Sequence, residues 1–200
     1  MPEFHILLPR PLLSALVALL LIAGPATAQT TINTTINEVV KLSEADTRHF
    51  GWSSDLSASV GIVGALENSE GASESGAAYV YRYAETGWTS TKLLPTDGPQ
   101  EDARFGQSVG ATEDLVVVGA RQNGGKAYVY RWNGASWNGT KLVSSDRESG
   151  DSFGRAVAAD VSSGTERVVV GARGDNTDTG AVYVYQWNGS TWNETKITAS

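Results

Sequence analysis

The chain has 200 residues, a formal net charge of -7 and no cysteine. The lack of cysteine excludes disulfides and thiolate metal sites, so packed secondary structure must supply the stability. Lys and Arg are scattered along an acidic sequence. Because a nucleic acid or an anionic membrane requires a basic face, we expect neither as a partner.

The first 28 residues have the pattern of an export signal. Arg10 precedes an apolar run at residues 12–23, and an Ala-Thr-Ala cleavage pattern ends at Ala28. The run is shorter than the roughly 20 apolar residues that span a bilayer. We therefore predict cleavage after Ala28, no transmembrane segment in the remaining chain, and a secreted, periplasmic or cell-surface location. Residues 29–38, rich in Thr and Asn, are predicted to form a linker.

The rest of the chain contains three copies of one pattern. Each copy has a Phe-Gly pair, a strand that ends in Gly-Ala, a Tyr-Val-Tyr strand, and a strand with Thr-Lys followed by Leu or Ile. A period of about 50 residues with four strands per copy predicts blades of a β-propeller, which must stack to bury their apolar faces. The framework positions of the repeat are Phe50, Gly51, Gly64, Ala65, Phe105, Gly106, Gly119, Ala120, Phe153, Gly154, Gly171 and Ala172.

The predicted fold is all-β, with three four-stranded antiparallel blades. The blades lie at about residues 50–94, 105–143 and 153–198, within a repeat region at 39–200. Residues 38–42 resemble the fourth strand of each copy and predict a spare outer strand. Because closed propellers have four to eight blades, we expect a partial propeller. Either further blades follow in a longer protein, or a complete chain closes by self-association.

We expect the strands to differ in how far neighbouring sheets cover their faces. Residues 115–118 and 168–170 are uniformly apolar, which predicts neighbouring sheets on both faces. The Tyr-Val-Tyr strands alternate, which predicts a partly covered surface. A four-residue Asn-Gly loop between Trp132 and Trp137 predicts a hairpin that brings the two rings together, and the third copy repeats it. A platform for carbohydrate is the alternative role of these Trp pairs.

The sequence resembles a known repeat family. Phe-Gly followed by Val-Gly-Ala, a glycine-rich loop and Tyr-Val-Tyr is similar to the FG-GAP repeat of integrin α-subunit propellers and of many exported bacterial proteins. The chain departs from the motif's last residue, because Leu66, Arg121 and Arg173 stand where Pro would be. The resemblance implies a seven-bladed propeller, with calcium bound in some blades between the Phe-Gly strand and the Gly-Ala strand.

Two segments of the third copy are candidates for calcium. Asp160 begins the segment at the position that the resemblance implies, although this segment lacks most of the carboxylates that a shell of six to eight oxygens requires. Asp175, Asn176 and Asp178 form a second acidic segment after Gly-Ala, for which a polar turn is the alternative. We expect no other cofactor.

Two short motifs are explained better by the repeat than by chemistry. Residues 106–110 have the G-x-S-x-G spacing of a hydrolase nucleophile elbow, but they lie in a strand. His49, the one His after the export signal, is expected beside Phe50 in a loop. Arg173-Gly174-Asp175 spells an adhesion tripeptide within ordinary repeat text. We therefore expect no catalysis.

The leading hypothesis is an exported, non-catalytic module that binds an extracellular protein or glycan. The candidate contacts are loops at residues 67–76, 122–126 and 174–180, which vary while the strands repeat. One alternative is a propeller hydrolase or lyase with acidic residues around a central channel. The other is a structural segment of a larger surface protein.

Overall fold

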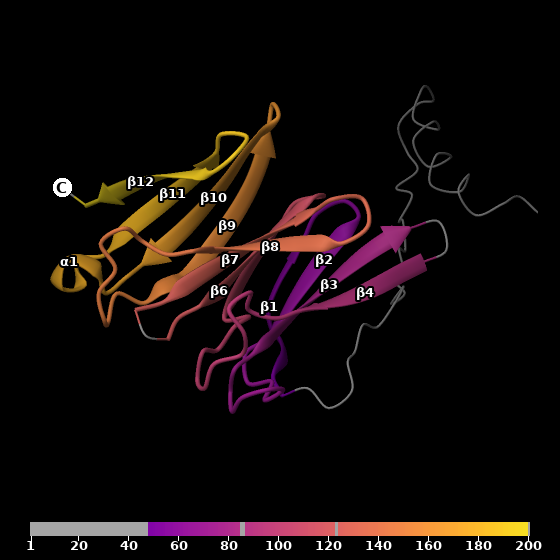
Figure 1. Ribbon diagram of the computed structural model, residues 1–200, viewed down its shortest axis with the longest axis horizontal. Coiled ribbons are helices and arrows are strands. Elements are labelled where there is room, and N and C mark those ends of the chain that lie inside the picture. Colours follow the sequence, from indigo (N-terminus) through magenta and orange to yellow (C-terminus); the bar gives the residue numbers. More distant parts are fainter. Residues whose placement is uncertain (1–47, 85–86, 123, 200) are drawn as a thin grey trace, which may run out of the picture. The chain divides into compact units, whose positions relative to one another are not determined.

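The computed structural model describes residues 48–84, 87–122 and 124–199. The export signal, the linker and the spare outer strand lie outside these residues. In the described part of the chain, twelve strands form three antiparallel sheets of four strands each (Figure 1). This result confirms the prediction of an all-β fold built from propeller blades.

The strands of each blade pair in the order in which they follow in the sequence. Blade 1 comprises β1 (Phe50–Leu56), β2 (Val60–Ala65), β3 (Ala77–Ala84) and β4 (Gly87–Leu93). Blade 2 comprises β5 (Ser108–Ala111), β6 (Leu115–Ala120), β7 (Lys126–Trp132) and β8 (Trp137–Leu142). Blade 3 comprises β9 (Phe153–Ser162), β10 (Thr165–Ala172), the short turn α1 (Asp175–Asp178), β11 (Ala181–Trp187) and β12 (Trp192–Thr198).

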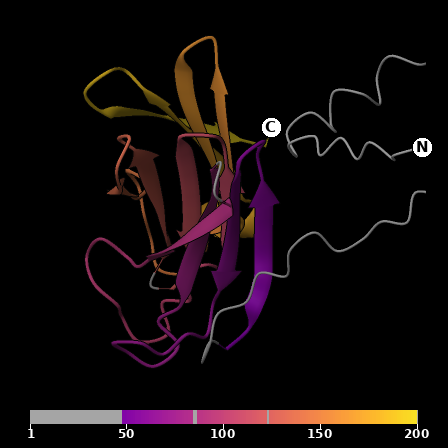
Figure 2. The same ribbon diagram turned by 90° about the vertical axis from the view of Figure 1, so that its right-hand side faces the viewer.

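The two ends of each sheet carry different connections. Antiparallel pairing places Phe50 beside Ala65, and Ala65 beside Ala77. The linkers between blades therefore lie at the same end as the β2–β3, β6–β7 and β10–β11 loops. We call this the linker end and the opposite one the hairpin end. The long indigo and magenta loops at the bottom of Figure 2 belong to the linker end of blade 1.

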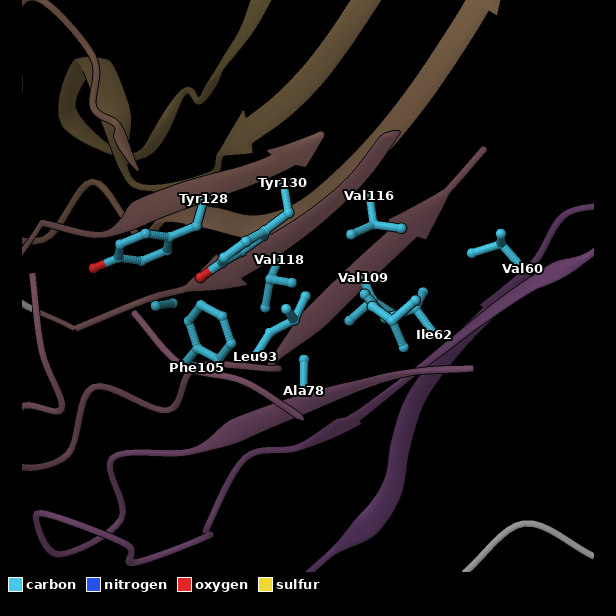
Figure 3. Close-up of a cluster of buried hydrophobic side chains, with 12 residues drawn as sticks. Val60, Ile62, Ala78, Leu93, Phe105, Val109, Val116, Val118, Tyr128 and Tyr130 are labelled. Atoms are coloured by element: carbon cyan, nitrogen blue, oxygen red, sulfur yellow. The ribbon is translucent and has the colours of Figure 1, made fainter. Parts of the chain in front are cut away.

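Apolar side chains pack between blades in two separate cores. The first core joins Val60, Ile62, Ala78, Val80 and Leu93 of blade 1 to Phe105, Val109, Val116, Val118, Tyr128 and Tyr130 of blade 2 (Figure 3). The second joins Leu115, Val117, Val129 and Leu142 of blade 2 to Phe153, Val168, Val170, Tyr183 and Tyr185 of blade 3. Blade 2 is therefore buried on both faces, as expected of stacked repeats.

The Tyr-Val-Tyr strands are more deeply buried than their alternation predicted. Tyr128 and Val129 point to opposite faces of blade 2, and both are buried because a neighbouring blade covers each face. The expectation of a partly covered surface is wrong for this blade. It holds for blade 3, where Tyr183 is buried and Val182 is exposed.

The Trp hairpins form as predicted, and they also connect neighbouring blades. Trp132 pairs with Trp137 across the strands, with ring centroids 5.4 Å apart. The guanidinium of Arg82, from blade 1, lies 5.0 Å from the Trp132 ring centroid. Arg131 of blade 2 lies 4.3 Å from the ring centroid of Trp187 in blade 3. These cation–π contacts give the Trp pairs a framework role.

Candidate functional site

The framework residues around Phe105 and Phe153 form the two junctions between blades at the linker end. Phe105 packs edge-on against Tyr128 of its own blade, with ring centroids 5.3 Å apart, and its backbone forms a bridge with Gly76 of blade 1. Ser53 Oγ donates a hydrogen bond to the Gly106 carbonyl at 2.8 Å. At the second junction, Phe153 forms the equivalent bridge with Gly125, and Ser108 donates to Gly154 at 2.9 Å. Ser108 therefore serves a junction in this structure.

A Tyr-Lys-Asp cluster lies beside each of these junctions. Tyr128 Oη donates to Asp97 Oδ1 at 2.7 Å, while Lys126 and Lys141 Nζ contact Asp97 Oδ2 at 2.9 and 3.2 Å. Although burial raises the pKa of Asp97, these three donors hold it well below its usual range. Asp97 comes from the linker before blade 2. The cluster therefore ties the linker to that blade.

The blade 3 cluster uses Asp175, one of the calcium candidates. Tyr183 Oη donates to Asp146 at 2.6 Å and also contacts Asp175. Lys196 Nζ contacts Asp146 at 2.6 Å and Asp175 at 2.8 Å. Asp175 is buried, so the Arg-Gly-Asp tripeptide does not present its carboxylate to solvent.

Two of the other calcium candidates, Asn176 and Asp178, line one hollow of about 520 Å³ together with Asp175. Asn176 and Thr177 have left-handed backbone angles, and Asn176 and Asp178 are exposed on the turn α1. Asp160 is exposed on β9 and faces Arg167 at 3.8 Å. Within the described residues, no group of three or more His, Asp or Glu side chains is arranged to hold a metal ion. Calcium stays a prediction from the sequence.

Four arginines gather at the linker end of blades 2 and 3. The Gly106 amide donates to the Gly119 carbonyl at 3.1 Å, which places the turn that begins at Arg104 beside the strand end that leads to Arg121. A Cβ at Gly154 would lie 3.3 Å from the Ala120 nitrogen, so the backbone next to Arg155 lies beside the residue that precedes Arg121. Arg155 lines a hollow of about 690 Å³ together with Arg173. We call Arg104, Arg121, Arg155 and Arg173 the arginine group.

The arginine group is poorly neutralised. Arg104 contacts Glu74 at 3.2 Å, but its Nε is buried without a hydrogen-bond partner. Within the described residues, no carboxylate lies within salt-bridge distance of Arg121, Arg155 or Arg173. Burial and the positive charges of the other three arginines lower the pKa of Arg121. Guanidinium groups in this state are suited to binding carboxylate, sulfate or phosphate oxygens.

The sequence did not predict the arginine group, because we expected the basic residues to be scattered. Its members are far apart in the chain and meet only when two blades stack. One signal was available, because Arg121 and Arg173 occupy the same repeat position after Gly-Ala. The three variable loops lie at this same end, beside the arginine group.

The FG-GAP repeat family model matches residues 37–81, 88–130 and 137–185, which is more than half of the chain. The chain belongs to the FG-GAP repeat family. FG-GAP repeats form β-propeller modules that are frequent in surface and adhesion proteins. The second and third matches run from the outermost strand of one blade to the Tyr-Val-Tyr strand of the next. The FG-GAP repeat is thus offset from the blade by one strand, and each of these two matches contains a complete blade junction.

No curated protein matches the chain. Within the described residues, no helix has the length and apolar character needed to cross a lipid bilayer.

Proposed function

We propose that this FG-GAP protein is an exported, non-catalytic propeller module that binds a protein or a glycan at or outside the cell surface. The linker end is its binding surface. The observation that carries the proposal is the arginine group, which places poorly neutralised cations beside three loops of variable sequence on a rigid scaffold. The pattern of an export signal supports its location.

The charge of this surface indicates what the partner offers. The chain as a whole carries a net charge of -7, so non-specific attraction to polyanions is weak. The arginine group instead provides local positive charge, which binds anionic groups at fixed positions. We therefore propose that the partner presents carboxylate or sulfate groups to the linker end.

Binding to four immobilised polymers tests this function. Heparin presents sulfate, polygalacturonate presents carboxylate on a glycan, polyglutamate presents carboxylate on a peptide, and dextran is neutral. We expect saturable binding to at least one charged polymer, and we expect salt to weaken it because screening acts on exposed charges. Dextran should not bind.

Arginine variants locate the binding surface. Arg121→Ala and Arg173→Ala should each weaken binding several-fold, because each removes a guanidinium from the arginine group. Arg167→Ala is the matched control, since this arginine faces Asp160 at the hairpin end. Equal losses in all three variants, or no binding to any charged polymer, would contradict the proposal.

A further inference from the structure

Glycine is required at the two blade junctions, because the backbone of the next blade lies where a Cβ would be. A Cβ at Gly64 would lie 2.1 Å from the Gly106 carbonyl oxygen, and a Cβ at Gly119 would lie 1.9 Å from the Gly154 oxygen. A Cβ at Gly76 would likewise lie 2.1 Å from the Phe105 carbonyl oxygen, and a Cβ at Gly125 would lie 1.8 Å from the Phe153 carbonyl oxygen. Each glycine pair thus forms a socket for a Phe-Gly segment. Figure 3 shows the side chains that pack around Phe105 at the first socket.

Blade 3 keeps the same two glycines in the same register. Gly171 pairs with Val182, which pairs with Ile197, just as Gly119 pairs with Ala127 and Ala127 with Leu142. A Cβ at Gly171 would meet the Ala156 Cβ at 3.6 Å, which is an ordinary contact. Gly171 also lacks a positive φ. Nothing among the described residues therefore requires glycine at this position, whereas a docked backbone would.

The face of blade 3 around Gly171 is apolar and exposed. Val169, Val182 and Ile197 are 37%, 38% and 53% exposed, while their blade 2 equivalents Val117, Ala127 and Leu142 are 0%, 0% and 5% exposed. The hollow of about 690 Å³ lies on this face, and Gly171, Gly180, Val182 and Ile197 line it. An apolar face of this kind marks an interaction surface.

Blade 1 presents the matching Phe-Gly segment. Phe50 packs edge-on against Tyr79 with ring centroids 5.6 Å apart, as Phe105 packs against Tyr128. Gly51 has a φ of +92°, close to the +89° of Gly106. Yet no described residue lies within 4 Å of a Cβ placed on Gly51. The described residues of one copy therefore contain a socket without a docked segment and a Phe-Gly segment without a socket.

We propose that Phe50 and Gly51 of a second copy dock on Gly171 and Gly180, so that copies associate head to tail through the junction that joins blades within one copy. Such an interface is heterologous, and two copies can close a ring while more copies form a longer chain. The proposal rests on blade geometry and requires no ligand, although the docking face shares its hollow with Arg155 and Arg173 of the arginine group.

The junction between copies should be weaker than those within a copy. Ala156 stands where Ser53 and Ser108 donate a hydrogen bond to the docked glycine carbonyl. The interface between copies therefore lacks one hydrogen bond. We expect concentration-dependent, reversible association.

Light scattering after chromatography of the purified chain, over a range of concentrations, tests the proposal. The wild type should pass from monomer to dimer or larger species as the concentration rises. Gly171→Ala should weaken this association at least about tenfold, because a Cβ at the equivalent Gly119 position overlaps the docked carbonyl. Ala156→Ser should strengthen it by restoring the missing donor.

A pair of Val→Asp variants separates the socket face from surface charge in general. Val182→Asp places a carboxylate in the socket and should abolish association. Val161→Asp adds the same charge at a valine that is 44% exposed on the opposite face of blade 3, and should leave association unchanged. Circular dichroism confirms that each variant is folded. A wild type that stays monomeric at every concentration, or equal association in the two Asp variants, would overturn the proposal, whatever the outcome of the polymer assays.

Discussion

Gly119 and Gly171 occupy equivalent positions in blades 2 and 3 but have different surroundings. A Cβ on Gly119 would overlap the Gly154 carbonyl, whereas a Cβ on Gly171 has ordinary contacts. Among the described residues of one copy, Gly119 lies at a junction between two blades and Gly171 does not.

This difference predicts opposite effects on stability for one chemical change. Gly119→Ala should lower the free energy of unfolding by about 1–3 kcal/mol, because the blades must separate to admit the methyl group. Gly171→Ala should leave it unchanged or raise it by up to about 1 kcal/mol, because the unfolded chain loses entropy. Urea unfolding at low protein concentration measures both. Similar losses for the two variants would contradict this view of the junction.

Glu113 predicts a pH dependence at the hairpin end. It accepts hydrogen bonds from the side chain of Ser59, from Ser57 Oγ at 2.7 Å and from the Ser59 amide at 3.0 Å. These bonds lower the pKa of Glu113 from 4.5 to about 2. Because the pKa of Glu113 is lower in the folded state, the ionised carboxylate raises the free energy of unfolding. This stabilisation is complete above pH 4.5 and disappears as the pH falls toward 2.

Glu113→Gln should therefore be less stable than the wild type at pH 7, and the difference should shrink steadily between pH 4.5 and pH 2. Unfolding midpoints at a series of pH values measure this difference. Glu101→Gln, at an exposed position in the linker before blade 2, controls for the loss of one charge. A Glu113→Gln difference that is constant across this pH range would show that these hydrogen bonds do not depend on the charge.

At the scale of strands and hairpins, a stacked arginine connects strands of two different blades. Arg131 lies over the Trp187 ring at 4.3 Å and contacts Glu166 at 2.9 Å. A planar guanidinium can satisfy both partners at once, whereas a lysine ammonium is a compact point charge.

Arg131→Lys should lower the free energy of unfolding by about 0.5–1 kcal/mol, because the stacked contact is lost while the charge stays. Arg167→Lys is the control, since Arg167 faces Asp160 and no ring contact is found for it among the described residues. Urea unfolding followed by Trp fluorescence measures both variants. An equal effect of the two changes would assign the role of Arg131 to its charge.

The elements themselves could be predicted from the sequence, because their signals are local. The Asn-Gly turn between Trp132 and Trp137 and the apolar run at 115–118 each specify one strand or hairpin. The arginine group and the stacking of Arg131 on Trp187 could not be predicted in this way. They depend on the rotation of one blade on the next, which a strand pattern does not encode. The burial of Val129 was underestimated for the same reason.

At the scale of the repeat region, blade 2 is the part that stacking stabilises most. Both of its faces contribute to an apolar core, whereas blade 3 contributes one face and leaves Val169, Val182 and Ile197 exposed. In stacked repeats, stability is the sum of intrinsic terms and of interfaces with neighbours. A blade with two such interfaces opens less often than a blade with one.

Hydrogen exchange should therefore be graded along the repeat region. At low concentration, amides of β6 and β7 should exchange most slowly, and those of β11 and β12 faster, because local opening of blade 3 disrupts one core instead of two. Raising the protein concentration should slow exchange in β10–β12 and at Phe50 and Gly51, while leaving β6 and β7 unchanged, because docking adds the missing interface to blade 3 of one copy and to blade 1 of another. Mass spectrometry of peptides from each blade measures this pattern. Uniform exchange across the three blades would mean that they unfold as a single unit and that their number of neighbours does not set their stability.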